Sequence, residues 1–221
     1  LNNSIIKKAR EKDLIQLKLV NIRDFANNKH NTVDDYPYGG GAGMVMQAGP
    51  IVRAFESVKE DAPKLKRVIY LSPQGATLTQ EKVVELAKED ELMFICGHYE
   101  GIDERAIDAV VTEELSIGDY ILTGGEMAAM IVIDAVSRHI EGVLSNSVSA
   151  DIESFDNSLL EYPQFTRPYE YEGMKVPDVL LSGNHKKIED YRHEQSLIRT
   201  ASKRPDLLKH AKLSKEDKKF L

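Results

Sequence analysis

The stretch LMFICGHYEG, residues 92–101, places a short apolar run directly before a loop that contains two glycines. A continuous apolar run such as Leu92 to Cys96 is typical of a strand that is buried on both faces. Val68 to Leu71 forms a second run of this kind, and Glu114 to Ile117 indicates a third strand. These runs predict the strands of one buried sheet.

Helical patterns separate and follow the predicted strands. Apolar residues recur at helical spacing in three segments: residues 51–58, 83–87 and 127–136. The second of these follows a capping-box arrangement at Thr77 and Gln80. Upstream, IQLKLVNI at residues 15–22 alternates as a half-buried strand does, and Asn2 and Ser4 precede a short helix through Ala9. Strands alternating with helices predict an α/β fold with a parallel sheet.

The last third of the chain has a different composition. Residues 145–162 are rich in Ser, Asn and Asp, which indicates a linker or loop between domains. From Lys186 the chain is charged and helical in periodicity, with an apolar stripe that we list as Ile188, Tyr191, Leu197 and Ile198. We therefore expect an α/β domain over residues 1–144 and a small, mainly helical domain over residues 163–221.

The charge of the chain is unevenly distributed. Its net charge is -7, which argues at first against a nucleic-acid partner. Residues 183–221, however, carry 11 Lys and Arg against 6 Asp and Glu, while the preceding residues carry 18 against 30. This asymmetry fits a polyanion-binding appendage, and equally a solvated helix surface. No apolar run approaches the roughly 20 residues that span a bilayer, so we expect no membrane span.

Loops rich in small and turn-forming residues follow all three predicted strands. They are residues 72–75 (SPQG), 97–101 (GHYEG) and 118–125 (GDYILTGG). In an open α/β sheet, ligands bind beyond the carboxyl ends of the strands, where glycine lets the backbone approach a ligand closely. Each loop alone is typical of a tight turn, but the three together indicate one pocket.

The absence of several motifs from the sequence narrows the class of ligand that the pocket could bind. The glycine run 39–43 lacks the spacing of a dinucleotide-binding loop, and no Walker A sequence is present. The histidines form no metal-binding helix pattern, and no G-x-S-x-G elbow occurs. The single cysteine, Cys96, ends an apolar strand, which favours an inert core thiol and a reducing compartment. A pocket of backbone groups and apolar walls suits an adenosine-containing cofactor.

The order and spacing of six motifs identify a family resemblance. The motifs are YPYGGGAGMVMQ (36–47), LSPQG (71–75), GHYEGIDER (97–105), SIGDYILTGGE (116–126), FTRP (165–168) and VPDVLLSGNH (176–185). Together they resemble the bacterial tRNA (guanine-N1)-methyltransferases, which belong to the trefoil-knotted SPOUT methyltransferases. The resemblance covers essentially the whole chain. It also implies that an apolar strand and a Phe-Pro turn precede Leu1 in the full protein.

The resemblance implies that the three loops form a knot that binds S-adenosylmethionine in a bent shape. The implied cofactor-binding residues are Leu71, Ser72 and Pro73; Gly97, Tyr99, Glu100 and Gly101; and Ile117, Gly118, Asp119, Tyr120, Ile121, Leu122, Gly124 and Gly125. It further implies a cytoplasmic homodimer with active sites between the subunits, and a C-terminal domain that helps to grip tRNA. Participation of Mg²⁺ is left open, and no dedicated metal site is expected.

Methylation at N1 of guanine needs a base for the N1 proton and positive charge near O6. The resemblance places the base in the interdomain loop, where the family has aspartate and this chain has Glu153, with Asp151 as the alternative. It places the assisting arginine at Arg138, which could instead be a charge that favours a helix end. Glu100 could contact the cofactor or the guanine, or could be a turn residue. Glu126 receives no role.

Two other functions remain open at this level. A related knotted methyltransferase could act on another RNA position. A catalytically silent RNA-binding protein with the same fold is the second alternative, motivated by the glutamate at residue 153.

Overall fold

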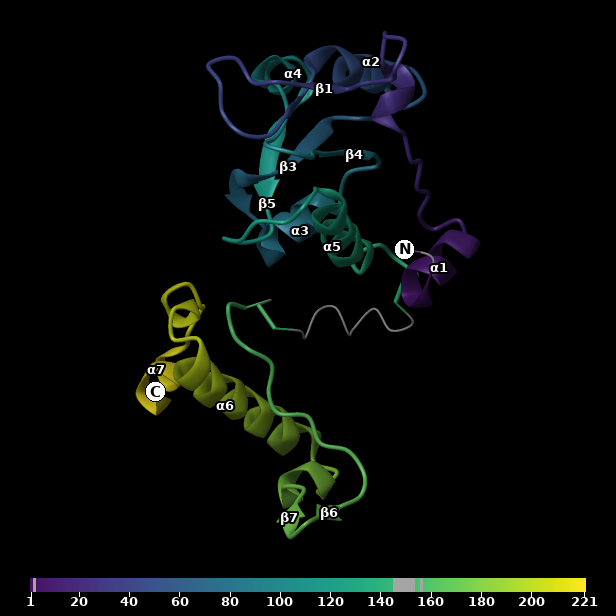
Figure 1. Ribbon diagram of the computed structural model, residues 1–221. Helices are drawn as coiled ribbons and strands as arrows, with labels where there is room; N and C mark the ends of the chain where they lie inside the picture. Colours follow the sequence, from purple (N-terminus) through teal and green to yellow (C-terminus); the bar gives the residue numbers. More distant parts are fainter. Residues whose placement is uncertain (2, 145–153, 156) are drawn as a thin grey trace. The chain divides into compact units, whose positions relative to one another are not determined.

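The computed structural model describes residues 1, 3–144, 154–155 and 157–221. The chain divides into two compact units, Leu1–Ser145 and Asn146–Leu221. Figure 1 shows both units. Within the described part of the chain, no helix combines the length and the apolar character that crossing a membrane requires.

The first unit is built on a parallel sheet of three strands with the order β4-β3-β5. The strands are β3 (Arg67–Thr77), β4 (Leu92–Cys96) and β5 (Glu113–Ser116). Leu71 of β3 lies opposite Cys96 of β4 and Leu115 of β5. The predicted α/β fold with a parallel sheet is therefore confirmed, and all three predicted strands are found to within a residue over their apolar runs.

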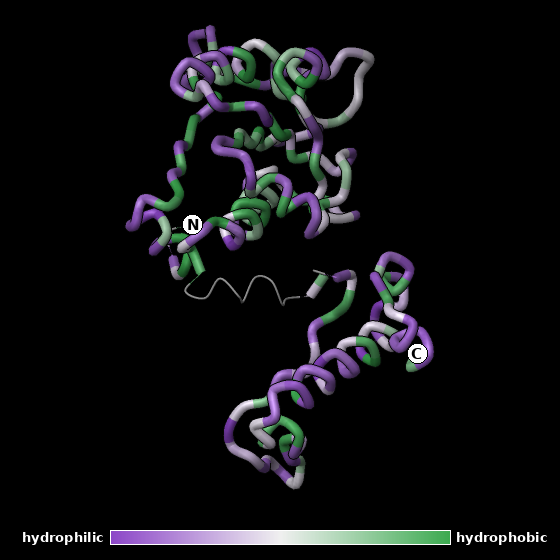
Figure 2. Tube along the Cα trace, turned by 180° about the vertical axis from the view of Figure 1, so that it is seen from behind, coloured by the Kyte–Doolittle hydropathy of each residue, from purple (hydrophilic) through white to green (hydrophobic). Residues whose placement is uncertain are grey.

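Helices cover both faces of this sheet. They are α2 (Ala48–Lys59), α3 (Gln80–Leu86), α4 (Glu104–Val110) and α5 (Glu126–Ser137). Val68 and Tyr70 pack into a core with α2 and α4, whereas Ile69 and Leu71 pack into a second core with α3 and α5. Alternate residues of β3 thus point to opposite faces, as strand geometry requires. Figure 2 shows the apolar stretches gathered in the strands and in α5.

Two predictions about local structure are wrong, and one helix was not predicted. Residues 15–21 have no regular secondary structure, and Leu19 is 92% exposed, so the predicted strand at residues 15–22 does not form. Its alternating pattern finds no sheet edge to pair with among the described residues. Thr77 ends β3, and the helix cap of α3 is Thr79, whose side chain accepts from the Lys82 backbone N–H. The helix α4 was not predicted, since Ala106 and Val110 are its only buried residues.

The remaining elements of the first unit are short. They are α1 (Ser4–Glu11), the 3-10 helix η1 (Ile22–Phe25), and the antiparallel pair β1 (Asp34–Asp35) and β2 (Val45–Met46). The predicted first helix is confirmed as α1. Its cap is Asn3, and the side chain of Asn3 makes no capping hydrogen bond.

The second unit is organised on one long helix. Its elements are β6 (Glu170–Tyr171), β7 (Met174–Lys175), η3 (Asp178–Leu181), α6 (His185–Lys203), η4 (Leu207–Lys209) and α7 (Lys215–Phe220). β6 and β7 form a tight antiparallel hairpin. His193 of α6 contacts Asp217 at 2.7 Å, and Ser214 and Asp217 form a capping box that begins α7.

The buried face of α6 differs from the predicted stripe. Leu197 is buried, but Ile198 is 47% exposed, so the assignment of Ile198 to the stripe is wrong. Ser196 and Thr200 complete the buried face instead. The Thr200 hydroxyl donates to Ser196 O and accepts from Leu160 N–H, which ties the segment before α6 to this helix. Hydrophobicity alone misses the face because two of its members are small polar residues.

Candidate functional site

The three predicted loops begin at the same edge of the sheet. After Leu71, residues 72–75 bulge out of β3, because Leu115 of β5 pairs with both Leu71 and Ala76. Ser72 is buried, and its hydroxyl accepts from the Gln74 N–H at 3.1 Å. The first predicted loop is therefore a bulge inside a longer strand rather than the end of one.

The third loop crosses the sheet to reach the second. Gly125 N–H donates to Gly97 O at 3.0 Å, and His98 pairs with Gly124 in an antiparallel bridge. In the sheet, β3 lies between β4 and β5. The loop that follows β5 therefore passes across the carboxyl end of β3 to join the residues that follow β4.

This crossing depends on close backbone packing at Gly125. A Cβ added at Gly125 would lie 2.8 Å from Cys96 Cα and 3.2 Å from Gly97 N. Gly118 is required for a second reason, because its φ is +142° and a Cβ there would lie 2.7 Å from the Tyr120 ring. The glycines of the third loop thus let it lie directly on the second loop.

The second loop is also fixed from its other side. It lies over the buried ring of Tyr70, whose hydroxyl oxygen would be 3.0 Å from a Cβ at Gly97. Glu100 N–H donates to Met44 O, and Met46 N–H donates to Gly101 O, each at 3.0 Å. The glycine run 39–43 leads directly into this contact.

Two side chains of the second loop lie at this junction. Glu100 packs on Gly43, where an added Cβ would approach Glu100 Cγ to 2.6 Å. Tyr99 has φ +58°, a left-handed conformation that is uncommon for a residue with a side chain. Its hydroxyl oxygen accepts from Arg23 Nη2 at 3.2 Å. Such strain is often held at functional sites.

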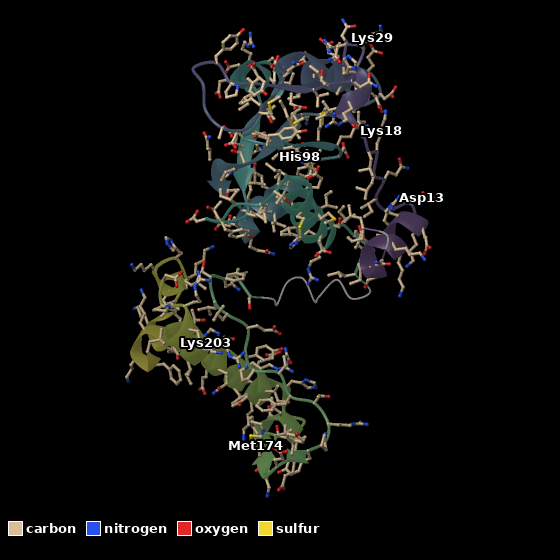
Figure 3. The ribbon with its side chains drawn as sticks, in the orientation of Figure 1. Asp13, Lys18, Lys29, His98, Met174 and Lys203 are labelled. Atoms are coloured by element: carbon tan, nitrogen blue, oxygen red, sulfur yellow. The ribbon has the colours of Figure 1, made fainter. Side chains whose placement is uncertain are left out.

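A side-chain hydrogen bond joins the second loop to Glu126, the first residue of α5 after the third loop. His98 Nε2 contacts Glu126 Oε1 at 2.5 Å, directly beside Gly124. Figure 3 labels His98 at the end of β4. Neither residue received a role from sequence. The sequence feature that could have indicated them is their position near the ends of the two strongest motifs, residues 97–105 and 116–126.

Cys96 ends β4, as predicted, and its chemistry is unreactive. Burial raises the pKa of the Cys96 thiol to about 11, with a further contribution from the Glu126 charge. The thiol is therefore protonated near neutral pH and is a weak nucleophile. This agrees with the inert core thiol expected from the sequence.

The exposed surface of the third loop suits an organic ligand. Tyr120, Ile121 and Leu122 are 53%, 79% and 37% exposed, and Asp119 beside them is also exposed. Apolar side chains next to glycine backbone groups provide the walls and the hydrogen-bonding edges that an adenosine needs. Among the described residues, no three His, Cys, Asp or Glu side chains gather as a metal-binding group.

Arg138, the predicted assisting arginine, lies far from the crossing of the loops at Gly125. Arg138 follows the last residue of α5, whereas Gly125 precedes the first. At 1.5 Å per helical residue, these two positions are roughly 20 Å apart. Glu153 and Asp151 lie outside the described residues, so their positions stay predictions.

Comparison with known proteins matches the chain over nearly its whole length. The family model described as tRNA (guanine-1)-methyltransferase TrmD matches residues 1–210. A tRNA (guanine-N(1)-)-methyltransferase of Caldicellulosiruptor saccharolyticus is 58% identical over 220 residues, which cover 100% of this chain and 89% of the relative. Proteins of the same name from Bacillus cereus strain AH820 and Bacillus anthracis strain CDC 684 are each 54% identical, covering 99% of this chain and 90% of the relative.

The matched residues include all three loops and the helices that carry them, so the likeness extends to the site itself. More than half of the aligned positions are identical over at least 99% of this chain, so the likeness covers the whole chain and not one domain alone. The chain therefore belongs to the tRNA (guanine-1)-methyltransferase family.

Proposed function

We propose that this protein transfers a methyl group from S-adenosylmethionine to N1 of guanosine 37 in tRNA, beside the anticodon. The observation that carries the proposal is the junction of the second and third loops at Gly97 and Gly125. It gathers glycine backbone groups and exposed apolar side chains at one edge of a parallel sheet, where ligands of α/β proteins bind. Membership of the family supplies the reaction class.

The crossing of the third loop also supports a trefoil knot of the SPOUT type. Strand β3 separates β4 from β5, yet the chain after β5 returns to the end of β4. Knots are very rare in proteins, and a loop that crosses a strand end in this way is the local feature that a knot requires. The bulge at residues 72–75 gives the crossing chain its other wall.

We assign the cofactor to the residues of the three loops that the sequence indicates. Leu71 and Ser72 begin the first wall, and Pro73 follows them. Gly97 to Gly101 and Ile117 to Gly125 form the others, including Gly118, Asp119, Tyr120, Ile121, Leu122 and Gly124. When bound, S-adenosylmethionine would supply a methyl group on a positively charged sulfur.

The reaction then needs two groups from the chain. A bond forms between guanine N1 and the methyl carbon as the bond from sulfur to that carbon breaks. The N1 proton passes to a carboxylate, for which we propose Glu153, with Asp151 as the alternative. The Arg138 guanidinium would stabilise the charge that grows on guanine O6.

Because Arg138 and the loops are at opposite ends of α5, one chain alone does not bring them together. A homodimer in which the arginine of one subunit serves the loops of the other would resolve this separation. Met127, Met130 and Ile131 support such a dimer, since they are spaced along one face of α5 and are 59%, 40% and 46% exposed. Exposed apolar faces of this kind mark association surfaces.

The second unit has features that suit tRNA. Arg199 and Lys203 of α6 line a shallow pocket together with Tyr162 and Gln164. The guanidinium of Arg192 lies 4.7 Å from the centre of the Tyr162 ring. Cations on one helix beside an aromatic ring fit a phosphate backbone. Because its proposed substrate is tRNA, we also propose a cytoplasmic location for the protein.

The proposal is tested first by calorimetric titration of the intact protein with S-adenosylmethionine and with its demethylated product. Failure to bind either would refute it. Glu153→Ala and Arg138→Ala should each reduce kcat by about 10²–10⁴-fold while cofactor affinity is retained. If Glu153→Ala and Asp151→Ala both leave methylation unchanged, the assignment of the base is wrong.

A further inference from the structure

Two tyrosines near the glycine run are almost fully exposed. Tyr36 is 79% exposed and Tyr38 is 101% exposed, and only Pro37 separates them. Aromatic side chains contribute most when they are covered, so two exposed rings only two residues apart indicate a binding surface. The tyrosines lie in the segment between β1 and β2, residues 36–44, which we call the arc. The arc projects past α4, as Figures 1 and 2 show from opposite sides.

The arc is open at its tip and fixed at its base. Gly40 N–H donates to Pro37 O at 3.3 Å, which closes a turn that contains Tyr38. A Cβ added at Gly39 or Gly40 would meet no atom within 4 Å, so the surface of the turn is unobstructed. At the base, Asp35 pairs with Val45, which holds the two ends of the arc together.

The base of the arc is joined to the proposed cofactor site. Met44, which follows the glycine run, accepts the Glu100 N–H, and Met46 donates to Gly101. Gly43 lies directly on the Glu100 side chain. The tyrosines are therefore carried by a segment that is anchored on the second loop, where the methyl-accepting base would be held.

An exposed cation follows shortly after the second loop. Arg105 is in the first turn of α4, and its side chain is 75% exposed. Asp103 binds it through Nε at 2.9 Å and Nη2 at 2.6 Å, which fixes the plane of the guanidinium. The hydrogen bond to Asp103 is the main cause of the raised pKa of Arg105.

We propose that Tyr36 and Tyr38 form a stacking surface for unpaired bases of the tRNA next to the methylated nucleotide, and that Arg105 of α4 contacts a phosphate of the same RNA. The inference rests on the proposed function, which brings an RNA loop to this edge of the sheet. Single-stranded RNA is typically bound by aromatic rings that stack on splayed bases and by arginines that contact phosphates. Glycines beside the rings leave space for a nucleotide.

An acidic residue, Asp35, directly precedes the tyrosines. Its carboxylate accepts the Tyr36 backbone N–H at 2.8 Å. This hydrogen bond holds the Asp35 carboxylate against the chain, at the base of the arc.

The test uses the full chain and an anticodon stem-loop RNA with guanosine at position 37. The variants are Tyr36→Ala, Tyr38→Ala and the corresponding phenylalanine substitutions, with Leu19→Ala as the control for removal of another exposed side chain. Loss of one stacking contact should raise the Kd for RNA about five- to 100-fold, whereas phenylalanine should preserve it. The Kd for S-adenosylhomocysteine should not change.

Arg105→Ala provides an independent measurement. It should lower the slope of log Kd against log salt concentration by about one, as expected for the loss of one phosphate contact. The Asp103 cap of α4 should survive this change, because the Asp103 carboxylate also accepts the backbone N–H of residue 105.

Three results would overturn the proposal. The alanine variants could bind RNA as tightly as the wild type does, or the phenylalanine variants could lose as much RNA affinity as the alanine variants. The variants could also change oligomeric state in light scattering, which would assign the rings to a contact between proteins. Failure of the proposed function is distinguishable, since the wild type itself would then bind neither cofactor nor RNA. A wild type that methylates the RNA normally, with tyrosine variants that bind it equally well, would refute this inference alone.

Discussion

Replacing Gly125 with alanine should separate the two loops that form the proposed cofactor site. The new Cβ would lie 2.8 Å from Cys96 Cα, a backbone atom that cannot rotate away. Since carbon atoms pack best at about 3.5–4.0 Å, the third loop must move by roughly 1 Å. That movement breaks the hydrogen bond from Gly125 N–H to Gly97 O.

The expected cost combines two effects. Overpacking of a tight contact costs about 1–3 kcal/mol, and the lost hydrogen bond adds about 0.5–1.5 kcal/mol. A total of about 2–4 kcal/mol corresponds to a fall in Tm of roughly 5–15 °C for a chain of this size. Because the loops form the site, the Kd for S-adenosylhomocysteine should rise at least about tenfold.

Gly49→Ala is the matched control for this substitution. A Cβ at Gly49 would approach the guanidinium of Arg53, with Nη1 at 3.0 Å, and no backbone atom; this guanidinium donates to Phe25 O. Gly49 lies in the first turn of α2, where alanine should be neutral or stabilising. Thermal unfolding gives the Tm of both variants, and calorimetry gives their Kd for S-adenosylhomocysteine. A Gly125→Ala protein with the wild-type Tm and the wild-type Kd would show that close contact at Gly125 does not hold the two loops together.

Three further predictions follow from ion pairs. Arg67→Ala should lower stability by about 1–3 kcal/mol, measured by urea unfolding, because Arg67 joins three glutamates of α3, β5 and the turn after α3; an unchanged midpoint would contradict it. His98→Ala should raise the Kd for S-adenosylhomocysteine about threefold, and adding Glu126→Gln should cause little further loss, as a double-mutant cycle would show. His193 chiefly lowers the pKa of Asp217 below 3.8, so this carboxylate stabilises the fold above pH 3.8 and loses that contribution as the pH falls through its lowered pKa; Asp217→Asn should remove that part of the acid sensitivity.

Much of the first unit follows from local sequence patterns. The run Leu92 to Cys96 is β4 to the residue, and the predicted helix at residues 127–136 lies within α5. Both are long or strongly apolar, so periodicity determines them. The loops after β4 and β5 were also predicted, because glycine and turn-forming residues mark them directly, whereas residues 72–75 are a bulge inside β3.

The contacts between these pieces could not be predicted in the same way. The hydrogen bond between Gly97 and Gly125 joins residues that lie on either side of another strand, and no periodic pattern records that crossing. The pair of His98 and Glu126 depends on the same crossing. The resemblance to a family supplied the knot as an expectation, and the strand order of the sheet supports it.

The strand predicted at residues 15–22 shows the opposite limit. Its alternation is genuine in sequence, but a strand needs a partner, and residues 15–21 have none among the described residues. An alternating pattern therefore predicts which faces a segment could present, whereas pairing is decided by the rest of the chain.

Methyl incorporation from labelled S-adenosylmethionine into defined tRNA transcripts directly tests the proposed methyl transfer to guanosine 37. Two transcripts that differ only at position 37, guanosine against adenosine, are compared, and the modified base is identified by mass spectrometry of nucleosides. Our account predicts N1-methylguanosine in the first transcript and no methylation of the second. Methylation of both transcripts, or of neither by a protein that binds the cofactor, would contradict it.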